Sequence, residues 1–338
     1  DIIEYCSENM PLYNPVSVSG YHIREAGSTA AQELAFTLNN GFAYIEECLE
    51  RGLKIDDFAH RLSFFFNAHM DFFEEIAKYR AARRIWANRL KDKYGAKNES
   101  SLKLKFHTQT AGCSLTAQQP ENNIVRTAFE AMSAVLGGTN SLHTNSLDET
   151  LALPSEKAAK IALRTQQILA FETGVPNVAD PLGGSWYIEE LTDKLEKQAI
   201  RYFEEIQEMG GTVQAIEDGY FQKKIAESAS IYQESVDSKE RIIVGVNDFV
   251  EEDEELDIEI LKISRDAQDT QEDKIKTLRK SRDEKTLQEK MKKLSDACKK
   301  DLNLVPFLIE VAEQGGTVGE IVEVMKKVYG EWEESFGI

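Results

Sequence analysis

Residues 101–150, SLKLKFHTQTAGCSLTAQQPENNIVRTAFEAMSAVLGGTNSLHTNSLDET, contain the pattern that decides the fold. Their apolar periodicity predicts a strand over 102–107, a polar loop, a helix near 121–136 and a second strand over 139–143. Each strand ends at a histidine, His107 or His143, and Thr, Gln, Asn, Ser and Glu side chains follow. Strand, helix and strand in this order predict a parallel βαβ unit.

The preceding residues repeat this pattern. VSVSGYHIREAG (16–27) begins with the alternation of a strand and breaks into a loop at His22. We predict helices over 30–51 and 70–93, a buried strand over 61–66, and a helix from Pro154 to Phe171. Four strand–helix units predict a parallel α/β fold and equal half of an eight-fold barrel. The strands form either an open doubly wound sheet or part of a ring that another piece of protein completes, and we favour the ring because half a barrel leaves two bare edges.

The pattern becomes mainly helical from about residue 200. An acidic run occupies 251–255, residues 265–300 are densely charged, and one strand-like fragment lies at 242–246. Charge runs of this kind are usually solvated faces. We therefore predict an α/β part over 1–200 and a mainly helical linker subdomain over 201–338.

Composition limits the classes of function. The 338 residues are 41% hydrophobic and 29% charged, which is typical of a globular protein, and no apolar run is long enough for a membrane span. The net charge of −19 argues against binding to nucleic acid or an acidic membrane. The four cysteines are far apart and form no CxxC pair, so we predict neither a zinc site nor a disulfide framework, and a cytoplasmic setting.

Three histidines at strand ends are the main candidates for chemistry. Ligands of barrels and parallel sheets bind at the carboxyl ends of the strands, where His22, His107 and His143 are predicted to lie. Each one alone could simply satisfy loop carbonyls. Arg61 beside Ser63 could hold a phosphate, although pairing on a helix surface is the alternative for the neighbouring arginines. HExxH, GxSxG, GxGxxG and P-loop motifs are all absent, so we predict no metal ligands in this chain.

The predicted strand faces are also unusual. A barrel core is normally filled by Val, Ile and Leu. Here the small polar residues Ser17, Ser19, Thr139 and Ser141 are predicted to share one face. Such a lining leaves room for a long polar ligand.

The same residues carry a family resemblance. NPVSVSGYHIREAG, RLSFF, HTQTAGCSLTAQ, NNIVRTAFEAM, GGTNSLHTNSLDE and ADPLGGSWYIEELT resemble the large subunit of the adenosylcobalamin-dependent methylmalonyl-CoA mutase family, from Asp1 to about Gly330. The resemblance implies the C-terminal half of a (β/α)8 TIM barrel followed by a linker. It implies an isomerase that rearranges acyl-CoA by radical chemistry, most simply (R)-methylmalonyl-CoA to succinyl-CoA, with adenosylcobalamin supplying the difficult step.

The resemblance also assigns roles to single residues. His22 is expected to hydrogen-bond the substrate thioester carbonyl as the catalytic residue. The expected substrate contacts are Tyr21, Arg61, Ser63, Lys105, His107 and Ser141. The expected cofactor contacts are Glu25, Gln109, Gly112, Asn145, Glu149 and Ala152.

Some features depart from the family pattern. Cys113 stands where tryptophan commonly packs on the corrin, and Arg24 replaces a frequent glutamine. No DxHxxG motif is present, so the cobalt ligand is expected from another chain or domain. We therefore expect this chain to be inactive alone and to need the N-terminal half of the barrel and a separate cobalamin-binding subunit, in an oligomer. The alternatives are an isobutyryl-CoA or 2-hydroxyisobutyryl-CoA mutase subunit and a non-catalytic mutase-like partner subunit.

Overall fold

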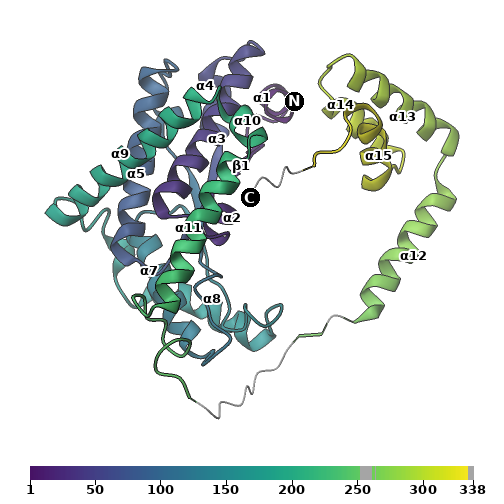
Figure 1. Cartoon of the computed structure of the whole chain (residues 1–338). Helices are drawn as coiled ribbons and strands as arrows, with labels where there is room; N and C mark the ends of the chain where they lie inside the picture. Colours follow the sequence, from purple (N-terminus) through teal and green to yellow (C-terminus); the bar gives the residue numbers. More distant parts are fainter. Residues whose placement is uncertain (252–260, 263, 334–338) are drawn as a thin grey trace. The chain divides into compact units, whose positions relative to one another are not determined.

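A computed structural model describes residues 1–251, 261, 262 and 264–333 (Figure 1). These residues fall into two units, which are described separately. Of these residues, 14–251 and 261 form the sheet unit, and 1–13, 262 and 264–333 form the helical unit. No described helix has both the length and the apolar character that crossing a lipid bilayer requires.

The sheet unit contains a four-stranded parallel sheet. Its strands are β1 (Ser17–Ser19), β2 (Ser63–Ala68), β3 (Phe106–Thr110) and β4 (Ser141–His143), and they pair in the order β1-β2-β3-β4. The register aligns Ser19 with Phe65, Phe65 with His107, and His107 with Ser141. This confirms the predicted parallel α/β fold, with four strands in sequence order as in part of a barrel.

Helices connect the strands, and most of the predicted helices are confirmed within a few residues. The sheet unit contains α2 (Tyr21–Glu25), α3 (Ala30–Glu50), α4 (Ile55–Phe58), η1 (Ala59–Arg61), α5 (Phe72–Asp92), α6 (Glu99–Leu102), α7 (Asn122–Leu136), α8 (Glu156–Phe171), η2 (Val175–Asn177), α9 (Trp186–Glu208), α10 (Thr212–Glu217) and α11 (Tyr220–Asp237).

The ends of the long helices follow from capping residues. Thr29 accepts a hydrogen bond from the Gln32 N–H, and the Gln32 side chain accepts one from the Thr29 N–H, so both donors at the start of α3 are satisfied. Asp71 caps α5 by accepting from the Glu74 N–H. Both helices therefore begin directly after the loops at the carboxyl ends of β1 and β2.

The two faces of the sheet differ in chemistry. Val18, Phe64, Phe66 and Phe106 are at most 3% exposed, and Trp86 of α5 packs edge-on against Phe64 with ring centroids 4.9 Å apart. Because side chains alternate along a strand, the residues between them point to the opposite face. That face, which we call the open face, carries Ser17, Ser19, Ser63, Phe65, His107, Gln109 and Ser141.

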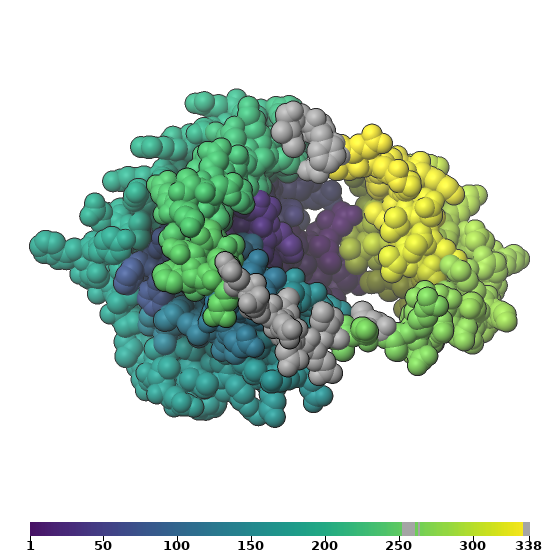
Figure 2. All heavy atoms as spheres, turned by 60° about the horizontal axis from the view of Figure 1, so that its bottom comes forward, coloured from purple at the N-terminus to yellow at the C-terminus, as the bar shows by residue number. Residues whose placement is uncertain are grey.

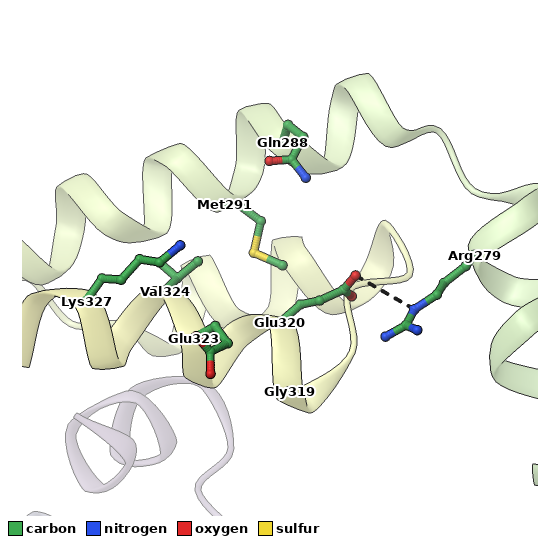
Figure 3. Close-up of a pocket in the computed structure, with 8 residues that line it drawn as sticks. All are labelled: Arg279, Gln288, Met291, Gly319, Glu320, Glu323, Val324 and Lys327. Carbon is green, nitrogen blue, oxygen red and sulfur yellow. Dashed lines mark ion pairs between the residues drawn. The ribbon is translucent and has the colours of Figure 1, made fainter. Parts of the chain in front are cut away.

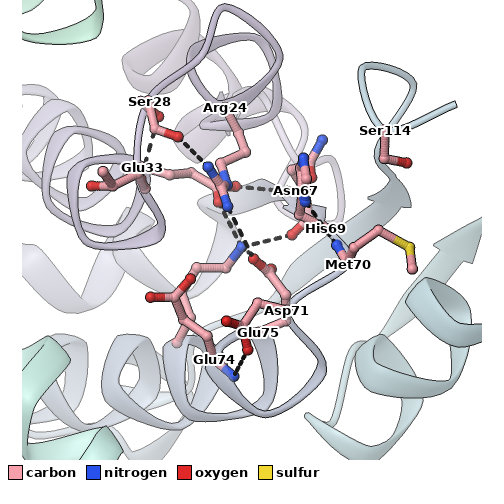
Figure 4. Close-up of polar contacts among 12 residues, drawn as sticks. Arg24, Ser28, Glu33, Asn67, His69, Met70, Asp71, Glu74, Glu75 and Ser114 are labelled. Carbon is pink, nitrogen blue, oxygen red and sulfur yellow. Dashed lines mark hydrogen bonds and ion pairs between the residues drawn. The ribbon is translucent and has the colours of Figure 1, made fainter. Parts of the chain in front are cut away.

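A buried charge cluster holds the end of β2 against α3 and α5 (Figure 4). Lys78 is fully buried, and its ammonium donates to Glu33 Oε2 at 2.6 Å, to the Asn67 carbonyl at 2.8 Å and to Glu75. The other oxygen of Glu33 accepts from the Asn67 N–H at 2.7 Å. Both backbone groups of Asn67 are thus fixed by side chains, which sets where this strand ends.

The helix α11 packs over the loop between α2 and α3 (Figure 1), and Figure 2 shows the α11 segment in green at the surface of the sheet unit. Ser228 donates to Gln32 Oε1 at 2.8 Å, and the Gln32 amide donates to the Lys224 carbonyl at 3.3 Å. The approach is close at Gly27, where a Cβ would come within 2.6 Å of the Ala229 Cβ, and the φ of +106° there also favours glycine. This segment is therefore part of the sheet unit.

The helical unit has a small core of its own. It contains α1 (Ile2–Asn9), α12 (Arg265–Ser281), α13 (Glu284–Lys299), α14 (Val305–Glu313) and α15 (Val318–Tyr329). Leu287, Leu294 and Val311 are fully buried in it. A groove of about 450 Å³ runs between α13 and α15, and Arg279 of α12 pairs with Glu320 at its end (Figure 3).

Five predictions about local structure need correction or limitation. His22 lies in the short helix α2 and not in a loop, and Arg61 ends η1 before the strand begins. Residues 242–246 form a turn with one bridge, Val244 to Asp248, and not a strand. Thr139 is not on the open face, because its hydroxyl contacts that of Thr108, a fully buried residue. Most of the acidic run, residues 252–255, lies outside the described residues.

Candidate functional site

A row of side chains crosses the middle of the open face. Phe65 stacks on Tyr21 with ring centroids 4.9 Å apart, and His107 lies on the other side of Phe65 at 5.0 Å. His107 Nδ1 is 2.7 Å from the Ser141 hydroxyl. These contacts bring together three of the predicted substrate residues around Phe65, an aromatic residue that the sequence reading did not include.

His22 lies at one end of this row. The Ser19 hydroxyl is 2.9 Å from His22 Nδ1, and the imidazole is edge-on to Phe65. When Ser19 donates to Nδ1, the proton of the neutral imidazole is on Nε2. The exposed His22 side chain can therefore present an N–H donor to a ligand on the open face.

A polar cluster occupies the carboxyl ends of the strands. Glu25 accepts hydrogen bonds from the Asn67 amide at 2.7 Å and from the backbone N–H groups of Gly112 and Cys113 at 3.0 and 2.9 Å. The Gln109 amide donates to the Tyr21 hydroxyl at 2.9 Å and to Asn145 Oδ1 at 2.8 Å.

Thr110 holds the donors of Asn145. The Asn145 side-chain amide donates to the Thr110 carbonyl, and the Asn145 backbone N–H donates to the Thr110 hydroxyl. Four of the predicted cofactor residues, Glu25, Gln109, Gly112 and Asn145, are thus assembled in one hydrogen-bonded cluster. Asn67 belongs to the same cluster. In the sequence, Asn67 could have been identified as a site residue because it is a polar residue near the end of a buried strand.

Gly112 lies where a side chain would be tightly packed. A Cβ at this position would be 3.1 Å from Glu25 Oε2, 3.3 Å from the Asn145 amide and 3.5 Å from the Tyr21 hydroxyl. Glycine at this position therefore lets Glu25, Asn145 and Tyr21 pack closely around the backbone, because a Cβ would crowd them.

The electrostatics keep several groups of the cluster neutral. Burial and the Glu25 charge raise the pKa of Tyr21 well above its usual value, so the phenol keeps its proton. Burial and the charges of Glu25 and Asp148 raise the pKa of Glu149, as expected for carboxylates near one another. Burial lowers the pKa of His107, and His143 lowers it further, which favours the neutral imidazole.

Glu149 and Ala152 belong to the loop that follows β4. The N–H of Glu149 donates to the Ser146 carbonyl, and that of Ala152 donates to the Asp148 carbonyl. The buried Asp148 side chain accepts from the Ser155 N–H at 2.9 Å and ties this loop to the start of α8. The charge of Glu149 also contributes to the raised pKa of Tyr21, so Glu149 lies within electrostatic range of the cluster. Ala152 is held in the loop by its backbone hydrogen bond to Asp148.

Three further predicted residues lie at the opposite end of the open face. The Ser63 hydroxyl donates to the Val16 carbonyl at 3.1 Å, and the Lys105 ammonium donates to the His60 carbonyl at 2.8 Å. Arg61 lies just before β2. Ser63 is four residues from Asn67, which is about 13 Å along a strand. The structure therefore does not gather all predicted residues at one point; it spreads them along the open face.

A buried pair behind the cluster was missed by the sequence reading. Ser114 lies 2.6 Å from Glu130 Oε1 and 3.0 Å from the Ala111 carbonyl. Burial raises the pKa of Glu130 well above its usual value, so the protonated acid can donate to the Ser114 hydroxyl, which in turn donates to Ala111. This chain of contacts supports the backbone N–H groups that hold Glu25. Nothing in the helical pattern around Glu130 marks it as buried.

The described residues contain no cluster of three or more His, Cys, Asp or Glu side chains that could hold a metal ion. The site thus offers hydrogen-bond donors, carboxyl groups and an open polar surface. An organic ligand with a long polar part fits this chemistry.

Comparison with known proteins adds to this geometry. A protein-family model described as methylmalonyl-CoA mutase matches residues 1–331. The chain is 46% identical to the 2-hydroxyisobutanoyl-CoA mutase large subunit of Aquincola tertiaricarbonis, over 99% of this chain and 60% of that protein. It is 48% identical to a methylmalonyl-CoA mutase of Rhizobium meliloti and 46% identical to the mitochondrial enzyme of Homo sapiens, over 98% of this chain in both cases and 47% and 44% of those proteins. The chain therefore spans about half the length of these relatives.

Proposed function

Because this chain belongs to the methylmalonyl-CoA mutase family, we propose that it supplies the second half of a catalytic (β/α)8 barrel that rearranges the carbon skeleton of an acyl-CoA. In this proposal the N-terminal half of the barrel closes the ring on the bare edges of β1 and β4. The part over 1–200 belongs to the barrel, and the part over 201–338 is mainly a linker.

The observation that carries the proposal is the open face itself. A ring of eight strands would turn this face inward, where small polar residues leave space along the axis. The face extends about 13 Å from Ser63 to Asn67. One end of the face carries Ser63, Arg61 and Lys105, and the other end carries His22 and the Glu25 cluster. This arrangement suits a ligand with an anionic end and a thioester end.

His22 is proposed to act on the thioester carbonyl. Ser19 orients the imidazole through Nδ1, which leaves the Nε2 proton for the carbonyl oxygen. A hydrogen bond at that oxygen stabilises negative charge while the thioester group migrates. Tyr21, fixed by Phe65 and Gln109, forms the wall beside the substrate and stays protonated.

The cluster around Glu25 fits adenosylcobalamin. The small Gly112 keeps Glu25 and Asn145 in place. Polar contacts to the edge of the corrin and to the deoxyadenosyl group are proposed for Glu25, Gln109, Asn145 and Glu149. When bound, this cofactor supplies the organic radical that starts the rearrangement. The residues of this chain hold and orient the reactants and exclude water.

We propose (R)-methylmalonyl-CoA and succinyl-CoA as the pair that is interconverted. The second candidate is a 2-hydroxyisobutyryl-CoA or isobutyryl-CoA mutase, which the name of the Aquincola tertiaricarbonis relative favours. Because that relative is a large subunit, we propose a separate cobalamin-binding subunit as partner, in a cytoplasmic oligomer, with the cobalt ligand on the partner or on another domain.

The test is turnover by the complete large chain with a cobalamin-binding chain and adenosylcobalamin. Methylmalonyl-CoA and 2-hydroxyisobutyryl-CoA are offered separately, and the preferred substrate decides between the two candidates. We expect His22→Ala to lower kcat by about 100-fold or more while adenosylcobalamin still binds. No turnover of any acyl-CoA by the wild-type assembly would favour a non-catalytic partner subunit, and full turnover by His22→Ala would remove the role of His22.

A further inference from the structure

A second cavity of the sheet unit contains none of the residues assigned to the mutase site. It has a volume of about 680 Å³ and lies among α2, the starts of α3 and α5, and α11. Cavities of 300–1,000 Å³ are typical of small-molecule sites. We call it the α11 cavity, because Ser228, Ile231, Tyr232 and Ser235 of α11 form one of its walls.

His69 is the buried polar group of the α11 cavity. Only 9% of the residue is exposed, and its Nδ1 accepts a hydrogen bond from the Met70 N–H at 2.8 Å (Figure 4). An Nδ1 that accepts a hydrogen bond places the proton on Nε2. Among the described residues, Nε2 has no hydrogen-bond partner. Burial and the nearby charges of Arg24, Lys78 and Arg241 lower the pKa of His69 to about 3, so it remains a neutral donor.

Two arginines face the same cavity. Arg24 donates to the Ser28 carbonyl and lies 3.8 Å from Glu75, while its buried Nε has no acceptor. The guanidinium of Arg241 lies 5.0 Å above the Tyr232 ring and makes no ion pair with a described residue. A donor that is buried without an acceptor is costly, and a bound acceptor would remove that cost.

The start of α3 adds to the positive potential. Ser28, Thr29 and Ala30 line the cavity, and the N-terminus of this 21-residue helix carries a partial positive charge. The Thr29 side chain satisfies the Gln32 N–H, whereas the Ala30 N–H has no acceptor among the described residues. Helix, arginines and His69 thus offer donors from three different segments.

Three acidic residues also line the cavity and limit what can bind. The Asp71 side chain is used in capping α5, and burial together with Glu75 raises the pKa of Glu74. Glu240 is exposed, beside Arg241. These carboxyl groups can accept hydrogen bonds from hydroxyl or amino groups, so a ligand with an anionic end and polar donors at the other end matches both sides.

We propose that the α11 cavity binds a small organic anion, with its carboxylate or phosphate group at His69, Arg24, Arg241 and the start of α3. The proposal does not depend on the mutase function. Carboxylates and phosphates share the acceptor geometry that guanidinium groups recognise. Such a site, next to the loops that position His22 and Glu25, would couple occupancy of the cavity to the order of these loops.

Isothermal titration calorimetry of the full-length protein with inorganic phosphate, glycerol 3-phosphate and malonate tests the site. We expect saturable binding of at least one probe with a stoichiometry of one per chain. Phosphate and glycerol 3-phosphate report the phosphate source, and malonate reports the carboxylate source. Arg241→Gln should weaken binding about tenfold, because a charge-assisted contact is lost.

His69→Asn is the second variant, since asparagine keeps an acceptor for the Met70 N–H and removes the Nε2 donor. Arg201→Gln is the matched control, because Arg201 is an exposed arginine of α9 outside the cavity. We expect wild-type affinity in the control and weaker binding in His69→Asn. The proposal is overturned if none of the probes binds saturably, or if Arg241→Gln and His69→Asn bind as tightly as Arg201→Gln.

Discussion

Replacing Lys78 by methionine tests the buried charge cluster on which the site depends. The ammonium of Lys78 is shared by Glu33, Glu75 and the Asn67 carbonyl, and no part of the side chain is exposed. Methionine fills a similar volume without the charge, so two buried carboxylates lose their common partner. Breaking a buried ion pair in this way costs about 3–5 kcal/mol, and we expect the free energy of unfolding of the sheet unit to fall by that amount.

The loss should depend on pH. Burial raises the pKa of Glu33, and the charge of Lys78 opposes that rise. Without Lys78 the pKa rises further, so the folded variant binds a proton that the unfolded chain releases at neutral pH. Stability of the variant therefore falls as pH increases. The wild-type pKa of Glu33 is already raised to about 7, so the deficit of the variant relative to wild type should be larger at about pH 9 than at about pH 6.

Urea denaturation followed by Trp86 fluorescence measures both effects. Trp86 is 1% exposed in the sheet unit, whereas Trp186 and Trp332 are 91% and 63% exposed and can be replaced by phenylalanine to leave one reporter. The control is Lys93→Met, which removes an exposed pair with Glu46 and should cost about 0–1 kcal/mol. A Lys78→Met variant as stable as this control, or a loss that is the same at both pH values, would refute the reasoning.

Three further predictions concern the cluster around Glu25. In Gly112→Ala the new Cβ would crowd Glu25 and Asn145, so the affinity of the complete assembly for adenosylcobalamin should fall about tenfold. Urea denaturation should show a loss of less than about 2 kcal/mol in the free energy of unfolding. Unchanged affinity would contradict the role given to Gly112. Burial and the charge of Glu25 raise the pKa of the Cys113 thiol to about 12, so alkylation of Cys113 should be slow at pH 8. Mass spectrometry should show faster alkylation in Glu25→Gln. Equal rates in both proteins would contradict an effect of Glu25 on the thiol. The pKa of Glu130 is raised in the folded protein, so the protein should lose stability as pH rises above the pKa that Glu130 has in the unfolded chain. Thermal melts at several pH values should show a weaker dependence of stability on pH in Glu130→Gln. The same dependence in the variant and the wild type would show that another group binds the proton.

The order of strands and helices could be predicted from the sequence because each element has a clear period. The stripe of Leu34, Leu38, Phe42 and Ile45 predicted α3, and all four residues are at most 2% exposed. The predicted strand over 61–66 starts two residues before β2, because Leu62 extends the apolar run of Phe64 to Phe66 whereas Arg61 belongs to η1. Periodicity therefore gives the elements, and local hydrogen bonds decide where they end.

The candidate site was predicted in part. His107 contacts Ser141, and Gln109 contacts Tyr21 and Asn145. The predicted strand over 102–107 was wrong in its position, because β3 spans Phe106–Thr110 and His107 lies near its start, not at its end. Phe65, Asn67, Glu130 and the charge cluster of Lys78 were not predicted, because their roles arise from contacts between segments far apart in the sequence. Helical position alone does not reveal that Lys78 is buried, since the same pattern is compatible with an exposed lysine.

The most direct test of the open face is a crystal structure of the complete assembly with an acyl-CoA bound. We predict that the thioester carbonyl lies within hydrogen-bond distance of His22 Nε2, that the chain of the ligand runs past Ser141 and His107, and that its phosphates lie near Arg61 and Ser63. An acyl-CoA bound elsewhere, or an open face covered by helices of the other half, would contradict the account.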